Sequence, residues 1–401
     1  MAVRLATHFL EGSRLAMVDE TQLRALEEID FTWVYSDTKL NECVESWLQE
    51  PYIILDTEFE RSTTFYAKPG LIQIAASGLT YLIDPLSLTS LKPLAAVLES
   101  DEVVIVLHSM SEDIDLLSYA CDCHISNVFD TQIANAFLGN GSSVGYQRLV
   151  EAELDIALDK GETRSDWLKR PLSSKQLQYA AADVYYLETI YKNLLERLIK
   201  SPWQSAVEED CARQVESIES AVADPQNAYL KLRGAWDLPL PKQALLQKLV
   251  CWRDEMAVGK NLPKSWVFGD ASLIEMARTR PTAQNSLFSL PKVKPKSVKR
   301  FGLDAIALIS NAQEVVPEGF MPIAKPIKGK ELEFYKKIKS LVAKQAATAN
   351  IDPALIAGRK QMEAWVIHYW RDQNPDLPDL INGWRSDLIG QPLTELAATV
   401  L

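Results

Sequence analysis

The sequence predicts an α/β domain with a mixed β-sheet and flanking helices in its first half, followed by small all-helical domains in its second half. Short runs of β-branched and apolar residues alternate with helical patterns as far as residue 200. Beyond residue 235 the apolar residues recur only at helical spacing. With 401 residues and 47% hydrophobic content, the chain is long enough for two or three separate cores.

The elements of the first half follow from these patterns. Strands are predicted where β-branched, aromatic or apolar residues form short runs: 31–35, 52–58, 71–76, 80–84 and 103–107. Helices are predicted where apolar residues return at helical spacing: 40–48, 91–98, 132–138, 174–187 and 203–221. Because Ser77 and Gly78 separate two of the strands, we expect a hairpin and, with 52–58, three adjacent antiparallel strands.

Helix starts are predicted from residues that cap helices well. Ser36 precedes the first helix of the domain. After the strand 103–107 the chain enters a helix, for which Ser109 or Ser111 is the expected cap. Asp130 precedes another helix, and we interpret it as a structural cap.

Two carboxylates stand close together at the end of the strand 52–58. Asp56 and Glu58 are two residues apart, so their side chains point to the same face of the sheet. Like charges at that spacing are costly unless a cation lies between them. Oxygen ligands favour a hard divalent ion such as Mg2+ or Mn2+. A solvated strand end is the alternative for this pair taken alone.

Two more acids lie in later segments. Asp113 is expected in the first turn of the helix after 103–107, where the helix dipole alone also favours an acid. Asp183 follows Tyr179 by four residues, so both lie on one face of the helix 174–187. An aspartate is a poor helix former in mid-helix unless its charge is used, although a solvent-facing Asp183 remains the alternative.

Composition excludes several classes of protein. No apolar run approaches the ~20 residues of a membrane span, and the start has no leader-like apolar region, so we expect a cytoplasmic protein. The five cysteines show no zinc-finger spacing, which favours reduced structural thiols. A Gly-x-x-x-x-Gly-Lys-Ser/Thr phosphate loop is missing, which disfavours a helicase.

The net charge of −12 is unevenly distributed. Residues 1–210 carry 16 Lys and Arg against 34 Asp and Glu, a net charge of −18, whereas residues 211–401 carry 26 against 20, a net charge of +6. Such asymmetry suggests that the basic half contacts phosphates, although ordinary scatter of surface charge explains it equally well.

The four acids and the tyrosine occur in a recognisable order. Asp56, Glu58, Asp113 and Asp183, with Tyr179 before the last, resemble the two-metal 3′-to-5′ exonucleases known for an Asp-Glu-Asp-Asp set, in their tyrosine branch. Further motifs resemble bacterial ribonuclease D, namely 56–61, 65–66, 70–73, 107–108, 111–113, 130–132, 164–168, 170–172 and 179–183. The resemblance implies a ribonuclease H-like fold for the mixed sheet.

The resemblance also implies roles for the acids and the tyrosine. Two divalent ions, Mg2+ or Mn2+, would hold the scissile phosphodiester roughly 4 Å apart. Asp56 would bridge both ions, and Glu58 and Asp183 would complete the ion on the nucleophile side. Asp113 would hold the second ion through water. Tyr179 would orient the attacking water, because a tyrosine with a pKa near ~10 is a poor base at neutral pH.

The same resemblance suggests contacts with the terminal nucleotide. Phe59 and His108 flank the acids and are predicted to stack on it or touch it, with ordinary packing as the open alternative. One departure from the family is Ala67, where a proline is usual.

The second half resembles the HRDC domain, a helical nucleic-acid-binding module. The similarity rests on residues 252–254, 261–263 and 267–270. A second, divergent copy is indicated by Asn350, which corresponds to Asn261 at an offset of 350 − 261 = 89 residues, with 355–358 matching 266–269. The motif 383–385 and residues 388–390 also resemble the C-terminal copy of ribonuclease D. Two basic runs, 292–300 between predicted helices and 325–339, are candidate phosphate contacts.

These observations divide the chain into five parts: an extension, 1–30, with a helical pattern at 21–28; the exonuclease domain, 31–200; a linker helix, 201–234; and two HRDC-type domains, 235–315 and 330–401. We expect a monomeric, cytoplasmic 3′-to-5′ exoribonuclease that releases 5′-mononucleotides, with transfer RNA precursors and other structured RNA as substrates. A DNA exonuclease of proofreading or repair type and a catalytically idle RNA-binding scaffold are the alternatives.

Overall fold

The computed structural model describes residues 28–158, 161–223, 225–378 and 381–400. The predicted helical pattern at 21–28 lies almost wholly outside these residues. The described chain divides into two compact units. One contains the residues up to 59, 69–218 and those from 327 onward, and the other contains 60–68 and 219–326. Each unit is described by itself below.

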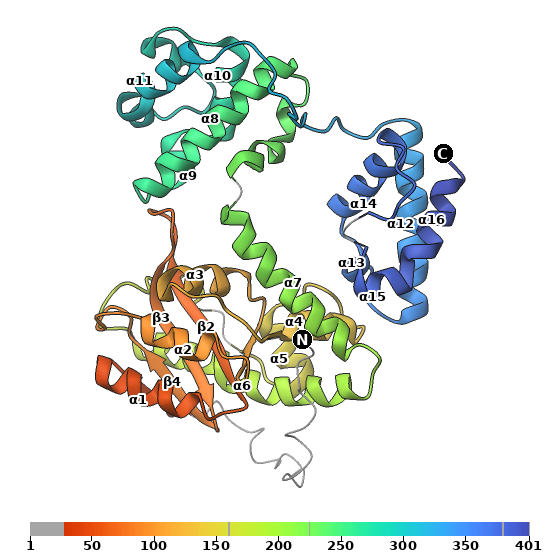
Figure 1. Ribbon diagram of the computed structural model, residues 1–401. Helices are drawn as coiled ribbons and strands as arrows, with labels where there is room; N and C mark the ends of the chain where they lie inside the picture. The colour runs from red at the N-terminus through yellow and green to blue at the C-terminus, as the bar shows by residue number, and fades with distance from the viewer. Residues whose placement is uncertain (1–27, 159–160, 224, 379–380, 401) are drawn as a thin grey trace. The chain divides into compact units, whose positions relative to one another are not determined.

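The first unit contains the predicted mixed sheet with its flanking helices (Figure 1). The sheet has six strands. Its strands are β1 (Thr32–Val34), β2 (Tyr52–Glu60), β3 (Lys68–Ala76), β4 (Leu79–Ile83), β5 (Val104–Leu107) and β6 (Val128–Asp130), in the order β1-β4-β3-β2-β5-β6. β3 pairs antiparallel with β4, whereas β1–β4, β2–β5 and β5–β6 are parallel pairs. The predicted adjacency of β2, β3 and β4 is therefore confirmed. The strand β6, only three residues long, is the one that the sequence pattern did not reveal.

The hairpin between β3 and β4 follows the predicted turn. Ser77 and Gly78 have φ angles of 50° and 74°, the left-handed conformation that a tight two-residue hairpin needs at both positions. β5 is buried along its whole length, as its continuous apolar run predicts. The buried central strands thus fix the backbone of β2, and with it the positions of the side chains at its end.

Helix starts agree with the sequence in some places and not in others. Ser36 caps α1 (Asp37–Trp47) by accepting a hydrogen bond from Lys39 N. The predicted helix 91–98 is a 3-10 turn (Lys92–Leu94) followed by α2 (Ala95–Leu98).

The prediction that Ser109 or Ser111 caps the next helix is wrong. α3 (Ser111–Cys121) begins after Met110 without a side-chain cap of its own. Asp130 instead accepts hydrogen bonds from Ser109 N at 3.2 Å and Met110 N at 2.9 Å. The same carboxylate caps α4 (Thr131–Phe137) through Gln132 N at 2.7 Å. One buried aspartate therefore satisfies two helix starts, and the structural role predicted for Asp130 is supported.

The remaining helices of the exonuclease segment are α5 (Tyr146–Leu154) and α6 (Ser174–Ile199). α7 (Gln204–Ala223) follows, within the predicted linker segment 201–234. α6 starts with a capping box, in which Ser173 and Gln176 satisfy each other's backbone N–H groups. Its 26 residues extend well beyond the predicted 174–187 because the apolar stripe continues through Ile190, Leu194 and Leu198, all buried.

Two helical modules follow, and they share one local geometry. The first module contains α8 (Leu240–Gly259), α9 (Lys264–Val267), α10 (Asp270–Thr279) and α11 (Pro295–Asn311). The second, the C-terminal module, contains α12 (Lys330–Ala349), α13 (Pro353–Ile356), α14 (Arg359–Val366), α15 (Gly383–Arg385) and α16 (Gln391–Ala398).

The predicted repeat is visible in these helices. α9 spans 264–267 and α13 spans 353–356, and both bounds differ by 89 residues, since 353 − 264 = 89 and 356 − 267 = 89. Asn261 and Asn350, at the same offset, both adopt the left-handed conformation, with φ of 46° and 53°. The next helix begins after Gly269 in one module and after Gly358 in the other. The two modules are thus built on one corner, a left-handed asparagine followed by a four-residue helix.

The basic run at 292–300 lies only partly between helices, although the sequence suggested an inter-helix segment for all of it. α11 begins at Pro295, so Lys296, Lys299 and Arg300 lie in its first turns.

In the described part of the chain, no helix has both the length and the apolar character that crossing a membrane requires.

Candidate active site

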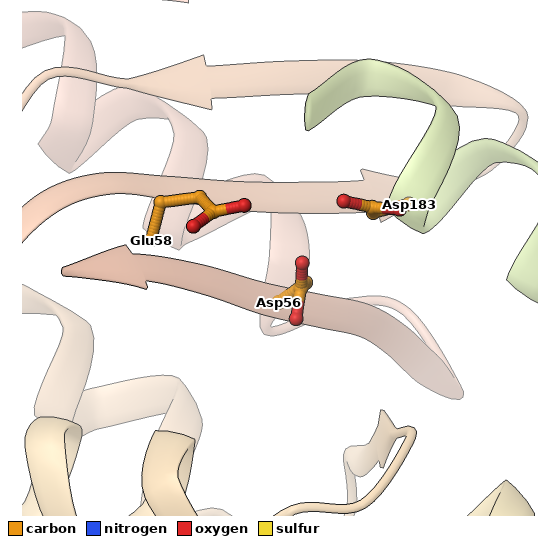
Figure 2. A group of neighbouring side chains, drawn as sticks. All are labelled: Asp56, Glu58 and Asp183. Atoms are coloured by element: carbon orange, nitrogen blue, oxygen red, sulfur yellow. The ribbon is translucent and has the colours of Figure 1, made fainter. Parts of the chain in front are cut away.

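Three carboxyl groups meet beside the end of β2. Asp56 and Glu58 extend from one face of β2, and Asp183 comes from α6 (Figure 2). One ligand oxygen of each lies within 4.8 Å of the others, so the predicted convergence of these three acids is observed. Thr57, between the first two on the strand, points to the opposite face and is 6% exposed.

The fourth predicted acid lies next to this group. Asp113, in the first turn of α3, is 7% exposed and accepts a hydrogen bond from the hydroxyl of Thr57 at 2.5 Å. Its charge acts on Glu58, and that of Asp56 acts on Asp113. Asp113 is not part of the three-residue cluster.

The electrostatics of the cluster disfavour four bare carboxylates. Burial and then the charges of Asp56, Asp183 and Asp113 raise the pKa of Glu58 to about 10. Burial raises the pKa of Asp183 to about 8, although a hydrogen bond from Tyr179 opposes the shift. Burial and the charge of Asp183 likewise raise the pKa of Asp56. A bound cation would offset this repulsion, as protonation does.

Tyr179 lies beside the cluster, one turn before Asp183 on α6. Its hydroxyl is 3.5 Å from the hydroxyl of Thr163, and its ring lies 6.1 Å from that of Trp167. Burial and then the charge of Asp183 raise the pKa of Tyr179 above its ordinary value. The phenol therefore keeps its proton at neutral pH and is placed to donate a hydrogen bond.

A pocket of about 600 Å³ opens over the acids, a volume within the range of small-ligand sites. Its lining includes Asp56, Glu58, Tyr179 and Asp183 together with residues from the start of α5: Gly145, Tyr146, Gln147 and Arg148. Arg148 is exposed and is the one lysine or arginine among the described residues that line this pocket. No local pattern in the sequence indicates the α5 residues, because their approach to β2 depends on how α5 packs against α6.

The two predicted nucleotide contacts are placed differently. His108 lines the pocket, and its ring nitrogens lie 3.0 Å from Thr131 Oγ1 and 3.1 Å from Val144 O. Burial lowers the pKa of His108, which favours the neutral ring. Phe59 follows Glu58 on β2, so it points to the other face of the strand and is not among the residues that line the pocket.

Several residues of the family-like motifs hold the segment 164–172 in place. Arg170 binds Asp84 through two nitrogens, at 2.5 and 3.0 Å, and donates to the carbonyl oxygens of Gly70 and Trp167 at 2.7 and 2.9 Å. A Cβ on Gly70 would lie 2.7 Å from the Cβ of Trp167, so only glycine fits there. Trp167, which these contacts hold in place, packs beside Tyr179.

A mixed sheet that presents four acids and a tyrosine in this arrangement defines a metal-dependent 3′-to-5′ exonuclease. The family model described as 3′-5′ exonuclease matches residues 31–199. Models of the HRDC domain and of the ribonuclease D C-terminal HRDC domain match residues 242–309 and 332–393. Ribonuclease D of Pseudomonas paraeruginosa is 35% identical over 368 residues, which cover 91% of this chain and 96% of the relative. The chain belongs to the ribonuclease D family and is a 3′-to-5′ exoribonuclease.

Solved structures agree with this assignment. The crystal structure of Escherichia coli RNase D, described as an exoribonuclease involved in structured RNA processing, is 33% identical and has a TM-score of 0.83, covering 92% of this chain and 99% of that one. The catalytic core of RRP6 from Trypanosoma brucei, at 21% identity and a TM-score of 0.54, shows a shared fold.

The acids fit the divalent ions that this family uses. Carboxylate oxygens are the ligands that hard divalent ions prefer, and the cluster supplies them within 4.8 Å of one another. The chain therefore uses divalent metal for its exonuclease activity.

Proposed function

We propose that this enzyme trims the 3′ ends of structured RNA, precursors of transfer RNA among them, and releases 5′-mononucleotides. The observation that carries the proposal is the cluster of Asp56, Glu58 and Asp183 within a pocket large enough for a terminal nucleotide. The description of the Escherichia coli relative as acting in structured RNA processing supports the choice of substrate.

In this proposal Asp56, Glu58, Asp113 and Asp183 would hold two ions, Mg2+ or Mn2+. Glu58 and Asp183 would help to hold one of them and Asp113 the other, with Asp56 contributing to both. Bound ions would supply charge neutralisation for the scissile phosphate and a more acidic water. Thr57 donates its hydrogen bond to Oδ1 of Asp113. In this proposal the other oxygen, Oδ2, faces the ion.

Tyr179 orients the attacking water in the proposed mechanism. An ordinary tyrosine has a pKa near ~10, so its hydroxyl donates a hydrogen bond at neutral pH and does not abstract a proton. Its position one turn from Asp183 places that hydroxyl beside the cluster.

Contacts with the nucleotide complete the site. We assign His108, which lines the pocket, to the terminal nucleotide. The predicted contact of Phe59 with that nucleotide stays a prediction, because its side chain points to the other face of β2. Arg148 supplies the positive charge for a backbone phosphate upstream of the scissile bond. An acidic pocket repels RNA unless ions and this guanidinium offset its charge.

The substrate reaches the site with help from the basic half of the chain. Residues 211–401 carry 26 Lys and Arg against 20 Asp and Glu, a surplus suited to contacts with the phosphates of a folded RNA. Because one chain supplies all the proposed site residues, a monomer is sufficient for activity.

The decisive experiment compares matched 5′-end-labelled RNA and DNA carrying the same 3′ extension, with Mg2+ or EDTA. We expect stepwise mononucleotide release from the RNA, and none in EDTA or with Asp56→Ala. Activity that survives EDTA would overturn the metal assignment. Equal rates on DNA would overturn the RNA assignment.

A further inference from the structure

The wall of the catalytic pocket opposite β2 is built by the segment between α4 and α5. Ser143 and Gly145 line the pocket, and the first turn of α5 contributes Tyr146, Gln147 and Arg148. Within the exonuclease segment, hydrogen bonds to two carbonyl oxygens hold this wall, one oxygen in the wall itself and one in α6. Val144 O lies 3.1 Å from a ring nitrogen of His108 and also accepts from the side chain of Gln132, and Ala182 O accepts from Tyr146 at 2.6 Å.

The same segment is also held by the C-terminal module. Asp352 is the N-cap of α13, and its Oδ1 accepts from Ala354 N at 2.8 Å. Its other oxygen, Oδ2, accepts from Ser142 N at 2.9 Å. Nearby, a Cβ on Gly139 would lie 3.1 Å from the carbonyl oxygen of Asn350. The corner of the module therefore lies directly against the pocket wall.

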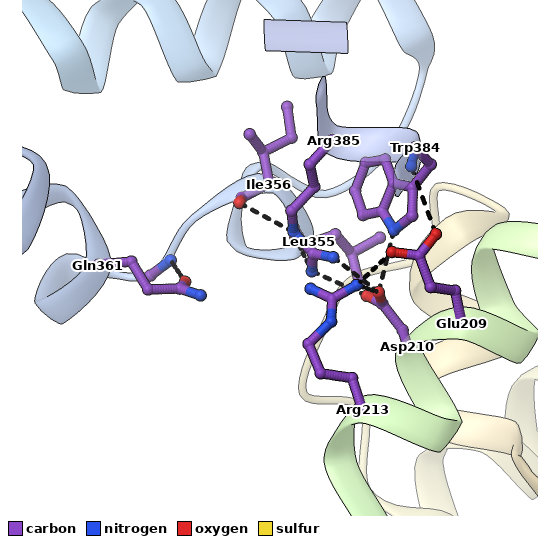
Figure 3. Close-up of polar contacts among 9 residues, drawn as sticks. Glu209, Asp210, Arg213, Leu355, Ile356, Gln361, Trp384 and Arg385 are labelled. Carbon is purple, nitrogen blue, oxygen red and sulfur yellow. Dashed lines mark hydrogen bonds and ion pairs between the residues drawn. The ribbon is translucent and has the colours of Figure 1, made fainter. Parts of the chain in front are cut away.

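An ion pair anchors the module to α7 close to this contact (Figure 3). Arg385 binds both oxygens of Asp210, at 2.7 and 2.8 Å, and the two side chains are 8% and 9% exposed. Arg213 and the indole of Trp384 bind the same carboxylate, at 2.7 and 2.9 Å. Arg385 also donates to the carbonyl oxygens of Leu355 and Ile356, the last two residues of α13. This pair fixes the corner relative to α7.

Trp384 extends the anchor to the end of α4. Its ring lies 5.0 Å from that of Phe137, the last residue of α4, and 6.0 Å from that of Trp203. At the preceding residue a Cβ would lie 2.2 Å from the carboxylate of Glu209, and the φ angle is +51°, so Gly383 is required. The module thus contacts the segment between α4 and α5 at two places. Trp384 packs against Phe137, just before the segment, and Asp352 binds Ser142 within it.

We propose that the C-terminal module positions the wall of the catalytic pocket, with Asp352 as a positioning residue that acts through Ser142 on the first turn of α5. The inference rests on the proposed function, because it concerns the same pocket. A module that served only to bind RNA would need no bond to the loop that leads into α5, the helix that carries Arg148.

The first module uses its matching corner in a similar way. Asn261, which corresponds to Asn350, accepts hydrogen bonds from Phe65 N and Tyr66 N at 3.0 and 3.1 Å. Those residues follow β2 in the chain and fall within the segment that matches the exonuclease family. In both modules, then, the corner after the first long helix holds backbone N–H groups of an exonuclease loop.

Asp352→Asn tests the proposal in the full-length protein. Asparagine is a good N-cap and keeps an oxygen for Ala354 N. Its amide nitrogen cannot accept a hydrogen bond from Ser142 N, so the variant loses the loop contact and keeps the helix cap. Asp387→Asn is the matched control, since Asp387 is an exposed aspartate of the same module, outside the contacts described above.

Two readouts are used. With a trinucleotide as the substrate, we expect Asp352→Asn to lower kcat/KM by roughly three- to tenfold. Without RNA or metal, we expect faster amide hydrogen exchange across residues 139–148 in Asp352→Asn and no change in Asp387→Asn.

The outcomes separate this proposal from the proposed function. Unchanged trinucleotide cleavage and unchanged exchange in Asp352→Asn would overturn the positioning role, as would a loss confined to long RNA. A wild-type protein that cleaves no RNA would overturn the proposed function, while the exchange experiment would still report whether Asp352 holds the loop.

Discussion

The hydroxyl of Thr57 donates a hydrogen bond to Oδ1 of Asp113 at 2.5 Å, with both side chains buried. This bond joins β2, which carries Asp56 and Glu58, to α3, which carries the fourth acid. Thr57 therefore has a task although its side chain points away from the cluster. Its hydroxyl holds the carboxylate of Asp113 in place.

Removing this hydroxyl is expected to impair catalysis without unfolding the protein. Thr57→Val keeps the shape of the side chain and leaves Asp113 buried without its donor, so we expect kcat to fall roughly ten- to hundredfold at saturating Mg2+. Thr57→Ser retains the hydroxyl and should stay within a few-fold of wild type. Steady-state cleavage of a short RNA measures both. Equal activity of the valine and serine variants would show that the bond does not position Asp113.

Tyr179→Phe removes only the hydroxyl beside Asp183. If that hydroxyl orients the attacking water, kcat should fall about a hundredfold, while KM changes little. Tyr185→Phe is the matched control, because Tyr185 is an exposed residue of the same helix. Single-turnover cleavage separates the chemical step from product release. A rise in KM with unchanged kcat would assign Tyr179 to substrate binding instead.

Arg148 offers a test of the phosphate contact. Arg148→Ala should raise KM for a short RNA roughly ten- to hundredfold and leave kcat within a few-fold, since a hydrogen bond to a charged group is lost. Arg148→Lys should recover part of the affinity, because a lysine keeps the charge but not the planar fork. The loss should shrink as salt rises, since each phosphate contact contributes to the salt dependence of binding. A loss that does not depend on salt would point to a packing role.

The sequence predicted the acids well and the remainder of the pocket poorly. Asp56 and Glu58 share a strand, and Tyr179 and Asp183 share a helix, so local periodicity was enough to place each pair on one face. Arg148 carries no such local signal, since it reaches the pocket only because α5 begins there. The cap of α3 was mispredicted for a related reason. Its acceptor, Asp130, is about twenty residues away in the chain and no local rule identifies it.

The C-terminal anchor shows the same limit. Residues 383–385 were singled out by resemblance alone, and only the fold shows that Gly383, Trp384 and Arg385 form a single contact with α7. The repeat, in contrast, was predictable to the residue. An offset of 89 residues in sequence appears as the same offset between α9 and α13, because both copies need a left-handed residue before a short helix.

The pair of Arg170 and Asp84 should stabilise the exonuclease fold in a pH-dependent way. Burial raises the pKa of Asp84, but hydrogen bonds from Arg170 and Ser87 outweigh it, so the pKa lies below its usual value. The pair therefore contributes its full stability above the unfolded pKa of about 3.9 and loses it as the pH falls through the folded value.

Asp84→Asn isolates this contribution. We expect the variant to unfold at a lower temperature than wild type at pH 7, and the difference to narrow as the pH is lowered below about 4. Arg170→Ala should cost about 3 kcal/mol at pH 7, because it leaves Asp84 buried without its main partner. Calorimetry at several pH values measures these differences. A difference between wild type and Asp84→Asn that stays constant with pH would mean that the carboxylate charge is not the stabilising feature.

The ion pair between Asp210 and Arg385 should hold the C-terminal module in its docked position. Asp210→Ala leaves the guanidinium of Arg385 buried with only backbone carbonyl oxygens as acceptors, so it should cost about 3–5 kcal/mol of docking free energy. Arg385→Ala should cost less, since Arg213 and Trp384 still bind Asp210. The double variant should cost less than the sum of the single changes, because neither charge is then left buried alone. Calorimetry that resolves the unfolding of the module can measure all three. Strictly additive effects would mean that the two side chains act independently, and that docking depends on the aromatic packing of Trp384 against Phe137 rather than on charge.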